Sequence, residues 1–306
     1  MSAKAPGSPL DLSIAIPTYN RGRILCETLE LLLELPARAA EILVIDQTKE
    51  HGPDVAARLA AWSATGAIRH IRLEEPSIPI AMNTALSSAR HEHVLFLDDD
   101  IIPGDGLVEA HQRALEDPEV WAVVGQVLQP GEEPCHFEET SLRGGLLPDL
   151  EFRFNHDRAC DVRNVMAGNL SVDRKRALSI GGFDENFIAV AYRFETDFAR
   201  RLVEAGGRIR YDPSASIRHL KVPAGGVRAW GDHRSSASPM HSVGDYYFAR
   251  HHVRRFWPYV RQRLLRNVIT RYHLAHPWAV VPKVIGELRG LALATKLAKK
   301  GRSLRE

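Results

Sequence analysis

The stretch HVLFLDDDIIP, residues 93–103, runs from an apolar segment straight into three consecutive aspartates. Residues 94–97 have the composition of a buried strand, and apolar residues resume at Ile101. Three neighbouring carboxylates repel one another, and their desolvation is costly unless a positive charge lies beside them. The pattern predicts a strand that ends at a charged site, with an exposed acidic turn as the alternative.

Strand and helix patterns alternate on both sides of this stretch. Strands are predicted at 12–17, 41–48, 68–73, 93–100 and 120–128, and helices at 23–35, 54–66, 78–90 and 104–117. Such alternation with short connections is typical of a parallel sheet with helices on both faces. Ligands bind beyond the carboxyl ends of such strands. Tyr19, Asn20, Asp46 and the aspartates at 98–100 all follow predicted strands, so we expect them to meet at one edge of the sheet.

The second half of the chain departs from this alternation. Residues 129–163 are rich in Pro, Gly and Glu, which predicts loops and edge strands. The elements expected next are a strand and a helix within 168–187, a helix at 194–207 and one or two strands at 209–220. Beyond Gly244 the pattern is helical. We therefore expect an α/β domain over residues 1–245 and a basic, amphipathic helical extension over residues 246–306.

The charge of the chain is unevenly distributed. The 306 residues are 44% hydrophobic with a net charge of +2, but residues 250–306 hold 14 Lys and Arg against 2 Asp and Glu. In this tail, aromatic residues lie among the basic ones in YYFARHHVRRFWPYVRQRLLR. This composition suits an anionic membrane surface, and equally a helix packed on the main domain with solvated charges. No nucleic-acid-binding module is recognisable, so we expect no nucleic acid partner.

The cysteines and the hydropathy pattern bear on location. Cys26, Cys135 and Cys160 are odd in number and far apart, which fits a reducing cytosol without a disulfide or zinc framework. The N-terminal residues lack the apolar core of a signal peptide, and no run approaches the ~18 apolar residues of a membrane span. We expect a cytoplasmic protein that would be peripheral at the inner face of the cell membrane if the tail binds lipid.

The three aspartates divide into two groups by the geometry of an extended chain. Asp98 and Asp100 point to the same side and Asp99 to the other. Hard divalent cations such as Mg²⁺ or Mn²⁺ are held by few carboxylates, with substrate phosphates filling the other positions. Asp98 and Asp100 can therefore share one metal ion that carries a diphosphate.

Six segments together resemble family 2 glycosyltransferases, which are inverting enzymes with a GT-A (Rossmann-like) fold. The segments IAIPTYNR, ILVIDQT, AMNTAL, LFLDDDIIP, GGFDENF and FETDFARRL occur in the family's order and approximate spacing over residues 12–220. The resemblance implies a mostly parallel sheet flanked by helices. It also implies transfer of a sugar, of the hexose class, from a nucleotide-diphospho-sugar to a hydroxyl of a glycan or lipid-linked acceptor in cell-surface polysaccharide or glycolipid synthesis. The motifs are specific for the superfamily and weak for the substrate.

The resemblance implies which residues contact the nucleotide. Pro17, Thr18 and Tyr19 match the segment that borders the base. Asp46 matches the acid that receives a ring N–H of the base, a suitable role for an acceptor-only carboxylate. The alternative is that Asp46 starts a turn.

Further residues match family positions that contact the other groups of the donor. Asn83 matches an asparagine that the family usually places after arginine, whereas Met82 precedes it here. Asp98 matches the residue near the ribose and the metal, and Asp100 the direct metal ligand. Asp99 is a further candidate for substrate binding, although its side chain is expected on the opposite side of the strand from Asp98 and Asp100.

The segment FETDFARRL matches the acidic helix start of the family. The match places Glu195 at the position of the catalytic base, which takes the proton of the acceptor hydroxyl. Phe194 stands where the family usually has glutamate. Asp197, on another side of the helix, is a substrate-binding candidate whose alternative is a first-turn acid that favours the helix dipole.

Two further residues complete the predicted site. His219 ends a predicted strand where some family members have a third metal or phosphate contact, and its alternative is a polar cap. Asp184, in GGFDENF, is expected to touch the acceptor or to cap a turn.

Two rival functions stay open. A nucleotidyltransferase that makes nucleotide-sugars shares this sheet and metal logic, but it normally has a Gly-rich basic loop after the first strand, whereas IPTYNRGR contains one glycine. A non-catalytic nucleotide-sugar-binding module at a membrane would not need the acid triplet together with Glu195.

Overall fold

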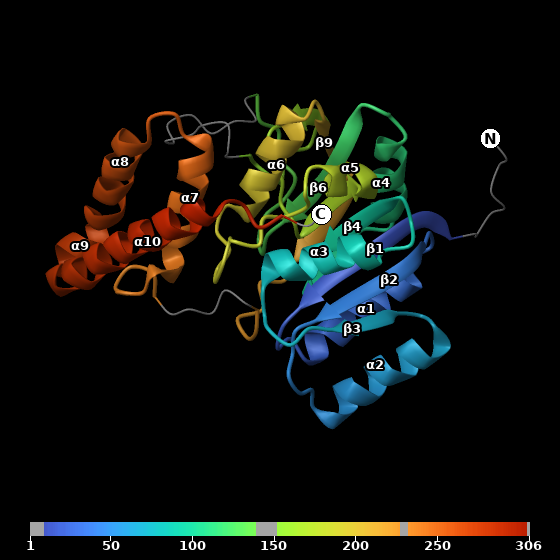
Figure 1. Ribbon diagram of the computed structural model, residues 1–306. Coiled ribbons are helices and arrows are strands. Elements are labelled where there is room, and N and C mark those ends of the chain that lie inside the picture. The colour runs from blue at the N-terminus through green and yellow to red at the C-terminus, as the bar shows by residue number, and fades with distance from the viewer. Residues whose placement is uncertain (1–8, 139–151, 227–231, 305–306) are drawn as a thin grey trace.

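The computed structural model describes residues 9–138, 152–226 and 232–304 (Figure 1). Within them, nine strands form one sheet in the order β3-β2-β1-β4-β8-β6-β9-β5, with β7 paired to β9. The strands are β1 Leu10–Thr18, β2 Ala39–Asp46, β3 Arg69–Arg72, β4 His93–Leu97, β5 Ile101–Pro103, β6 Val120–Leu128, β7 Cys160–Val162, β8 Asn169–Asp173 and β9 Arg208–His219. The α-helices are α1 Arg23–Glu34, α2 Pro53–Thr65, α3 Ile78–Ser88, α4 Leu107–Leu115, α5 Arg174–Ser179, α6 Phe194–Glu204, α7 Val243–His252, α8 Phe256–Val268, α9 Arg271–Ala275 and α10 Val280–Lys300.

The direction of the strands confirms the predicted α/β class. β3, β2, β1 and β4 are parallel neighbours. β8 lies antiparallel between β4 and β6, and β6 is parallel to β9. Six strands therefore run in one direction, while β8, β5 and β7 run against them. The carboxyl ends of β1, β2 and β4 meet at one edge, where polar sites were expected.

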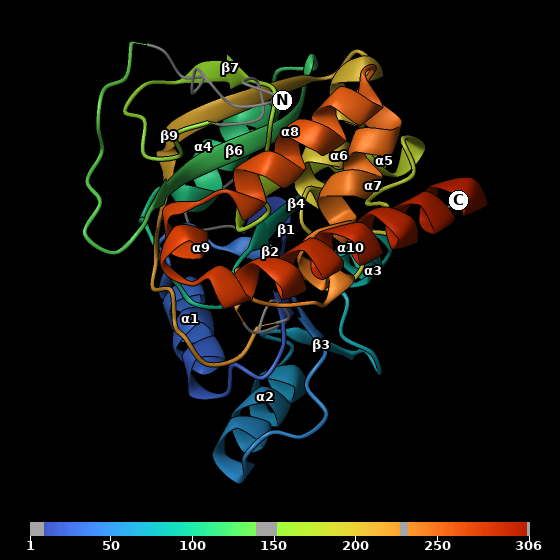
Figure 2. The same cartoon turned by 90° about the vertical axis from the view of Figure 1, so that its left-hand side faces the viewer.

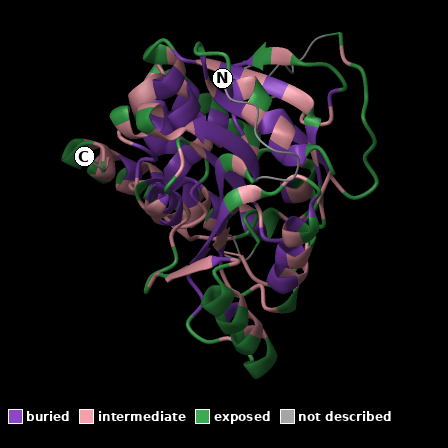
Figure 3. Ribbon diagram, turned by 90° about the vertical axis from the view of Figure 1, so that its right-hand side faces the viewer, coloured by how far each residue is buried: buried purple, intermediate pink, exposed green. Residues whose placement is uncertain are grey.

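Alternation of side chains gives the sheet two apolar faces. Leu12, Ile14 and Ile16 of β1 pack with α1 and α4 on one face, whereas Ala15 belongs to the cluster that includes α3 and α6. Figure 3 shows the buried strands between their helices, and the largely exposed α2 beyond the edge strand β3. The parallel strands carry near-continuous apolar runs because both of their faces are covered.

The C-terminal helices lie at one side of the sheet (Figures 1 and 2). They share the main core, because Tyr246, Tyr247 and Phe248 of α7 belong to the same buried cluster as strand residues. The boundary expected after residue 245 falls inside α7, since this helix spans Val243–His252. After α10, the chain returns to the sheet domain: Ser303 donates its N–H to Asp184 (3.0 Å) and accepts the N–H of Glu185 (2.9 Å).

Among the described residues, no helix has both the length and the apolar character that crossing a membrane requires.

Candidate functional site

A pocket of about 490 Å³ opens at the carboxyl ends of β1 and β4. Its lining includes Pro17, Thr18, Tyr19, Asp98, Asp99 and Glu195, together with residues 164–168. The Thr18 side chain lies beside Asp99, and its hydrogen bonding lowers the pKa of that carboxyl. Thr18 and Asp99 therefore form one polar part of the pocket wall.

Asp98 and Asp100 converge on His219. Nε2 of His219 is 3.1 Å from Oδ1 of Asp100 and 3.7 Å from Oδ2 of Asp98. The antiparallel pairing of β5 with β9 places His219 opposite Ile101, directly after the triplet. Three residues predicted as metal ligands, from distant parts of the sequence, thus lie side by side.

The contacts of Asp100 and His219 explain the directions in which the pKa values of both groups are shifted. Burial alone would raise the pKa of Asp100, but contacts with His219 and the N–H of Val222 (2.9 Å) lower it. The hydrogen bond with Asp100 raises the pKa of His219. Nδ1 of His219 lies 3.1 Å from Oε1 of Gln129, so both ring nitrogens face oxygen acceptors, and a cation bound at Nε2 would take the place of a proton there.

Asp99 pairs with Arg21 rather than with His219. Nε of Arg21 is 3.0 Å from Oδ1 of Asp99, and its Nη2 is 3.6 Å from Oδ2 of Asp100. Burial raises the pKa of Asp99 to about 7, although the charge of Arg21 acts against this rise. Arg21 donates to the carbonyls of Val222 and Ala224. Arg21 and His219 thus supply the positive charge that three adjacent acids require.

Gly168 makes room for Asp98. A Cβ atom at Gly168 would lie 2.2 Å from Oδ2 of Asp98, so any other residue would displace the carboxylate. The Asp98 N–H also donates to the Gly168 carbonyl (3.2 Å). The Asp98 side chain is 44% exposed toward the pocket, and two carboxylates with an imidazole suit Mg²⁺ or Mn²⁺. The residues present therefore fit the predicted cation.

Glu195 contacts Ala167, the residue before Gly168. It lies in the first turn of α6, lines the pocket and accepts the Ala167 N–H at 2.6 Å. Ala167 and Gly168 thus contact Glu195 on one side and Asp98 on the other. Phe194 is buried and packs on Phe183 with ring centroids 5.8 Å apart, which explains an aromatic residue at this position.

Comparison with known proteins identifies the family. Residues 13–176, more than half of the chain, match the family "Glycosyl transferase family 2". The chain belongs to this family.

Two curated relatives are themselves glycosyltransferases by name. The "Pre-mycofactocin glycosyltransferase" of Mycobacterium tuberculosis is 27% identical over 212 residues, which are 68% of this chain and 42% of the relative. The "Uncharacterized glycosyltransferase YfnE" of Bacillus subtilis is 25% identical over 259 residues, 69% of this chain and 65% of the relative. The family 2 chain thus spans less than two thirds of either relative.

Solved structures share the fold. GalNAc-T7 with UDP, GalNAc and Mn²⁺ superposes with a TM-score of 0.61 at 12% identity, covering 94% of this chain and 54% of the other. The mannosyltransferase PcManGT from Pyrobaculum calidifontis, in complex with GDP-Man and Mn²⁺, gives a TM-score of 0.51 at 18% identity, covering 98% and 81%. At these identities the likeness shows the GT-A fold alone.

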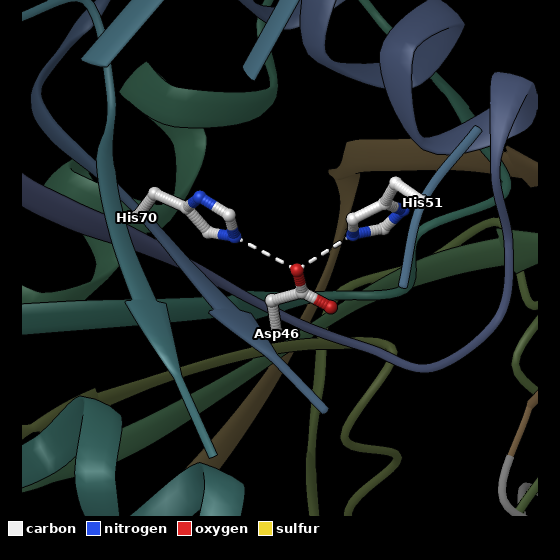
Figure 4. Close-up of side chains that lie close together, drawn as sticks. All are labelled: Asp46, His51 and His70. Carbon is white, nitrogen blue, oxygen red and sulfur yellow. Dashed lines mark hydrogen bonds and ion pairs between the residues drawn. The ribbon is translucent and has the colours of Figure 1, made fainter. Parts of the chain in front are cut away.

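In this family 2 chain, Asp46 is held by two histidines (Figure 4). Its Oδ2 lies 2.7 Å from Nε2 of His51 and 2.8 Å from Nε2 of His70, and its Oδ1 accepts the Thr48 N–H. Burial would raise the pKa of Asp46, but these contacts lower it well below its usual range. Asp46 is fully buried and does not line the pocket. Its contact with a nucleotide base stays a prediction.

Two other clusters offer metal-ligand chemistry. The ligand atoms of Asp46, His51 and His70 lie within 4.8 Å of one another, and zinc also takes two imidazoles and a carboxylate. Hydrogen bonding alone accounts for this arrangement. His136, His156 and Asp157 form the second cluster, within the segment 129–163.

Asp197 points into the protein rather than into the pocket. It is fully buried, with Oδ2 2.8 Å from Nε of Arg201 and Oδ1 2.8 Å from Nε2 of His252. Arg302 approaches Oδ1 at 3.3 Å. Asp197 therefore joins α6 to α7 and to the segment after α10, which is a structural role.

Asn83 was expected to touch substrate, and Asp184 to touch the acceptor or to cap a turn; the structure surrounds both with protein, and Asp184 accepts the Asn186 N–H in a turn (3.0 Å). Asn83 donates to the Phe183 carbonyl and accepts the Phe183 N–H, each at 2.8 Å. Asp184 accepts from the hydroxyl of Tyr247 at 2.8 Å and from the N–H of Ser303. Both are fully buried outside the pocket lining, so their contact with substrate stays a prediction.

Several lining residues were not predicted as site residues. Arg193 has a left-handed backbone (φ 73°) just before α6, and its Nε is 3.1 Å from Oδ1 of Asp245 on α7. Met82 lines the pocket where the family often has arginine. Arg21 could have been noticed because it follows the first predicted strand, but nothing local indicated its ion pairs.

Proposed function

We propose that this chain is an inverting, metal-dependent glycosyltransferase, which moves a sugar from a nucleotide-diphospho-sugar to an acceptor hydroxyl. One observation carries the proposal: Asp98 and Glu195 line one pocket and contact the adjacent residues Gly168 and Ala167, while His219 joins Asp98 to the buried Asp100 just outside the lining. Family membership supports it, as does Mn²⁺ in two proteins of the same fold.

Each residue has a defined task in this mechanism. Asp98, Asp100 and His219 would hold Mg²⁺ or Mn²⁺, which neutralises charge on the leaving nucleoside diphosphate. Thr18, which lines the pocket, would bond the donor through its hydroxyl. Glu195, oriented by the Ala167 N–H, takes the proton of the acceptor hydroxyl as its oxygen attacks the anomeric carbon. A single displacement of this kind inverts the anomeric centre.

The acceptor we propose is a glycan or a lipid-linked glycan, in the synthesis of cell-surface polysaccharide or glycolipid at the cytoplasmic side of the membrane, with a hexose as the transferred sugar. The motif resemblance and the basic aromatic tail support this proposal.

A thermal-shift panel of UDP-, GDP- and dTDP-sugars with and without Mn²⁺ tests the donor and the metal together. We expect one nucleotide class to stabilise the protein only with Mn²⁺, because a ligand at a hundred times its Kd adds about 2.7 kcal/mol to the free energy of unfolding. Asp100→Ala and Asp98→Ala should abolish this response. The exposed Asp105→Ala should retain it.

Equal responses of wild type and both ligand variants would overturn the metal assignment. A protein that no nucleotide-sugar stabilises, with or without metal, would overturn the donor class. Release of free nucleoside diphosphate in the presence of an acceptor separates transfer from simple binding.

Gly168→Ala should weaken Mn²⁺ binding in the presence of the nucleotide by about tenfold or more, as changes beside a metal ligand do. The added methyl group occupies the position of the Asp98 carboxylate. Titration of Mn²⁺ in the thermal-shift assay measures the effect. Gly52→Ala is the matched control because its Cβ would meet nothing within 4 Å. If both variants bind Mn²⁺ as wild type does, Asp98 is not a ligand.

A further inference from the structure

The helical extension exposes an unusual amount of apolar surface. Of twelve exposed large apolar residues among the described residues, eight lie between 257 and 288. Their exposed fractions range from 38% to 77%. We call this surface the outer face of the extension; its apolar members are Trp257, Leu265, Ile269, Leu274, Trp278, Val281, Ile285 and Leu288. Figure 2 shows α8, α9 and α10 in front of the rest of the molecule.

The exposed residues follow helical spacing. On α10, Val281, Ile285 and Leu288 are at positions i, i+4 and i+7, so they form one stripe. The opposite stripe packs inward: a Cβ atom at Gly290 would lie 2.0 Å from Oγ of Ser242, and one at Gly286 2.6 Å from the Ser236 carbonyl. The helix is thus fixed by one face and presents its apolar face outward.

The exposed charges of the helical extension all have one sign between residues 254 and 300. Residues 254–300 contain a single acid, Glu287, which is 1% exposed and pairs with Lys283 at 2.8 Å. The exposed charged residues of this range are Arg254, Arg255, Arg261, Arg266, Arg271, Arg289, Lys296, Lys299 and Lys300. The partner surface must therefore be negatively charged and must also offer an apolar phase.

We propose that the outer face of the extension docks on an anionic lipid bilayer. Aliphatic side chains such as Val281 and Ile285 gain from an apolar phase and gain nothing from phosphate groups, so nucleic acid fits less well. Tryptophan is favoured at the level of the headgroups, and each surface Lys or Arg is attracted by anionic lipid. A second copy of this chain would bring the same positive charges against one another.

Docking also orients the pocket. Asp245 and His252, on α7, hold Arg193 and Asp197, which flank Glu195 in sequence. The extension is therefore joined rigidly to the helix that bears Glu195, and the pocket keeps one orientation relative to the bilayer. Lipid binding needs no nucleotide, so it stands or falls independently of the proposed reaction.

Co-sedimentation with vesicles tests the docking. We expect the protein to bind vesicles of phosphatidylcholine with 30% phosphatidylglycerol, to bind pure phosphatidylcholine at least about tenfold more weakly, and to dissociate as salt rises. Arg261→Glu with Arg266→Glu should lower the partition coefficient by at least about tenfold, and so should Val281→Ser with Ile285→Ser.

Two controls match the variants. Arg38→Glu changes an exposed arginine, and Leu31→Ser an exposed leucine, on the sheet domain, and both should bind as wild type does. Equal binding to the two vesicle types, no binding at all, or unchanged binding of the extension variants would overturn the proposal. So would a dimer in light scattering that the serine variant converts to a monomer while neither binds vesicles.

Discussion

Replacing Glu195 by glutamine is expected to lower kcat by about 10²- to 10⁴-fold, the usual range for loss of a general base. Glutamine keeps the size of the side chain and an oxygen that can accept the Ala167 N–H, but it cannot take the proton of the acceptor hydroxyl. The KM of the donor should change little, because the lost interaction belongs to the transition state. Nucleoside diphosphate release under single-turnover conditions, with the donor found in the thermal-shift panel, measures the effect.

Glu204→Gln is the matched control, since Glu204 lies at the end of the same helix with its side chain 65% exposed. It should keep full activity. Glu195→Gln that retains more than about a tenth of the wild-type kcat, with an unchanged melting temperature, would rule out Glu195 as the base.

Asp197→Asn should lower the free energy of unfolding by about 3–5 kcal/mol at pH 7, because it leaves buried cations without their counter-charge. Arg201 and Arg302 lose their ion pairs with this one carboxylate, and His252 loses its hydrogen-bond partner. Urea denaturation of wild type and variant measures the difference. Asp161→Asn is the control, since its partners Arg208 and Arg210 lie on the surface and such pairs contribute about 0–1 kcal/mol.

The difference should also depend on pH. Burial would raise the pKa of Asp197, but His252, Arg201 and Arg302 lower it below its ordinary value. A lowered pKa in the folded state stabilises the protein above the unfolded pKa of about 3.9, and this stabilisation is lost as the pH falls through the folded value. The gap between wild type and Asp197→Asn should therefore narrow below about pH 4. A gap under 1 kcal/mol at pH 7 would contradict the structural role of Asp197.

The strands and helices could be predicted because their signals are local. Apolar runs bounded by Pro, Gly and polar residues placed β1 to β4 and the helices between them within a few residues. The antiparallel β8 could not be placed, because its insertion between β4 and β6 depends on pairing across more than forty residues rather than on its own pattern.

The candidate site was predictable only where it follows strand ends. Asp98, Asp99 and Tyr19 line the pocket, as convergence at the sheet edge predicts. Asp46 also ends a strand, yet its carboxylate is hydrogen-bonded to His51 and His70 and does not line the pocket. Such partners, like those of Asn83 and Asp184, are set by tertiary packing, and a strand-end rule carries no information on them.

The return of the chain after α10 makes the extension inseparable from the sheet domain. Ser303 pairs with Asp184 and Glu185, and Arg302 reaches Asp197, so the residues from α7 onward close a loop that begins and ends beside α6. A membrane-binding module that is joined to an enzyme by a flexible linker can be exchanged for another module. Here Arg302, directly after the helices proposed to meet the membrane, supplies counter-charge to the core, so we expect changes in the extension to alter both membrane affinity and fold stability.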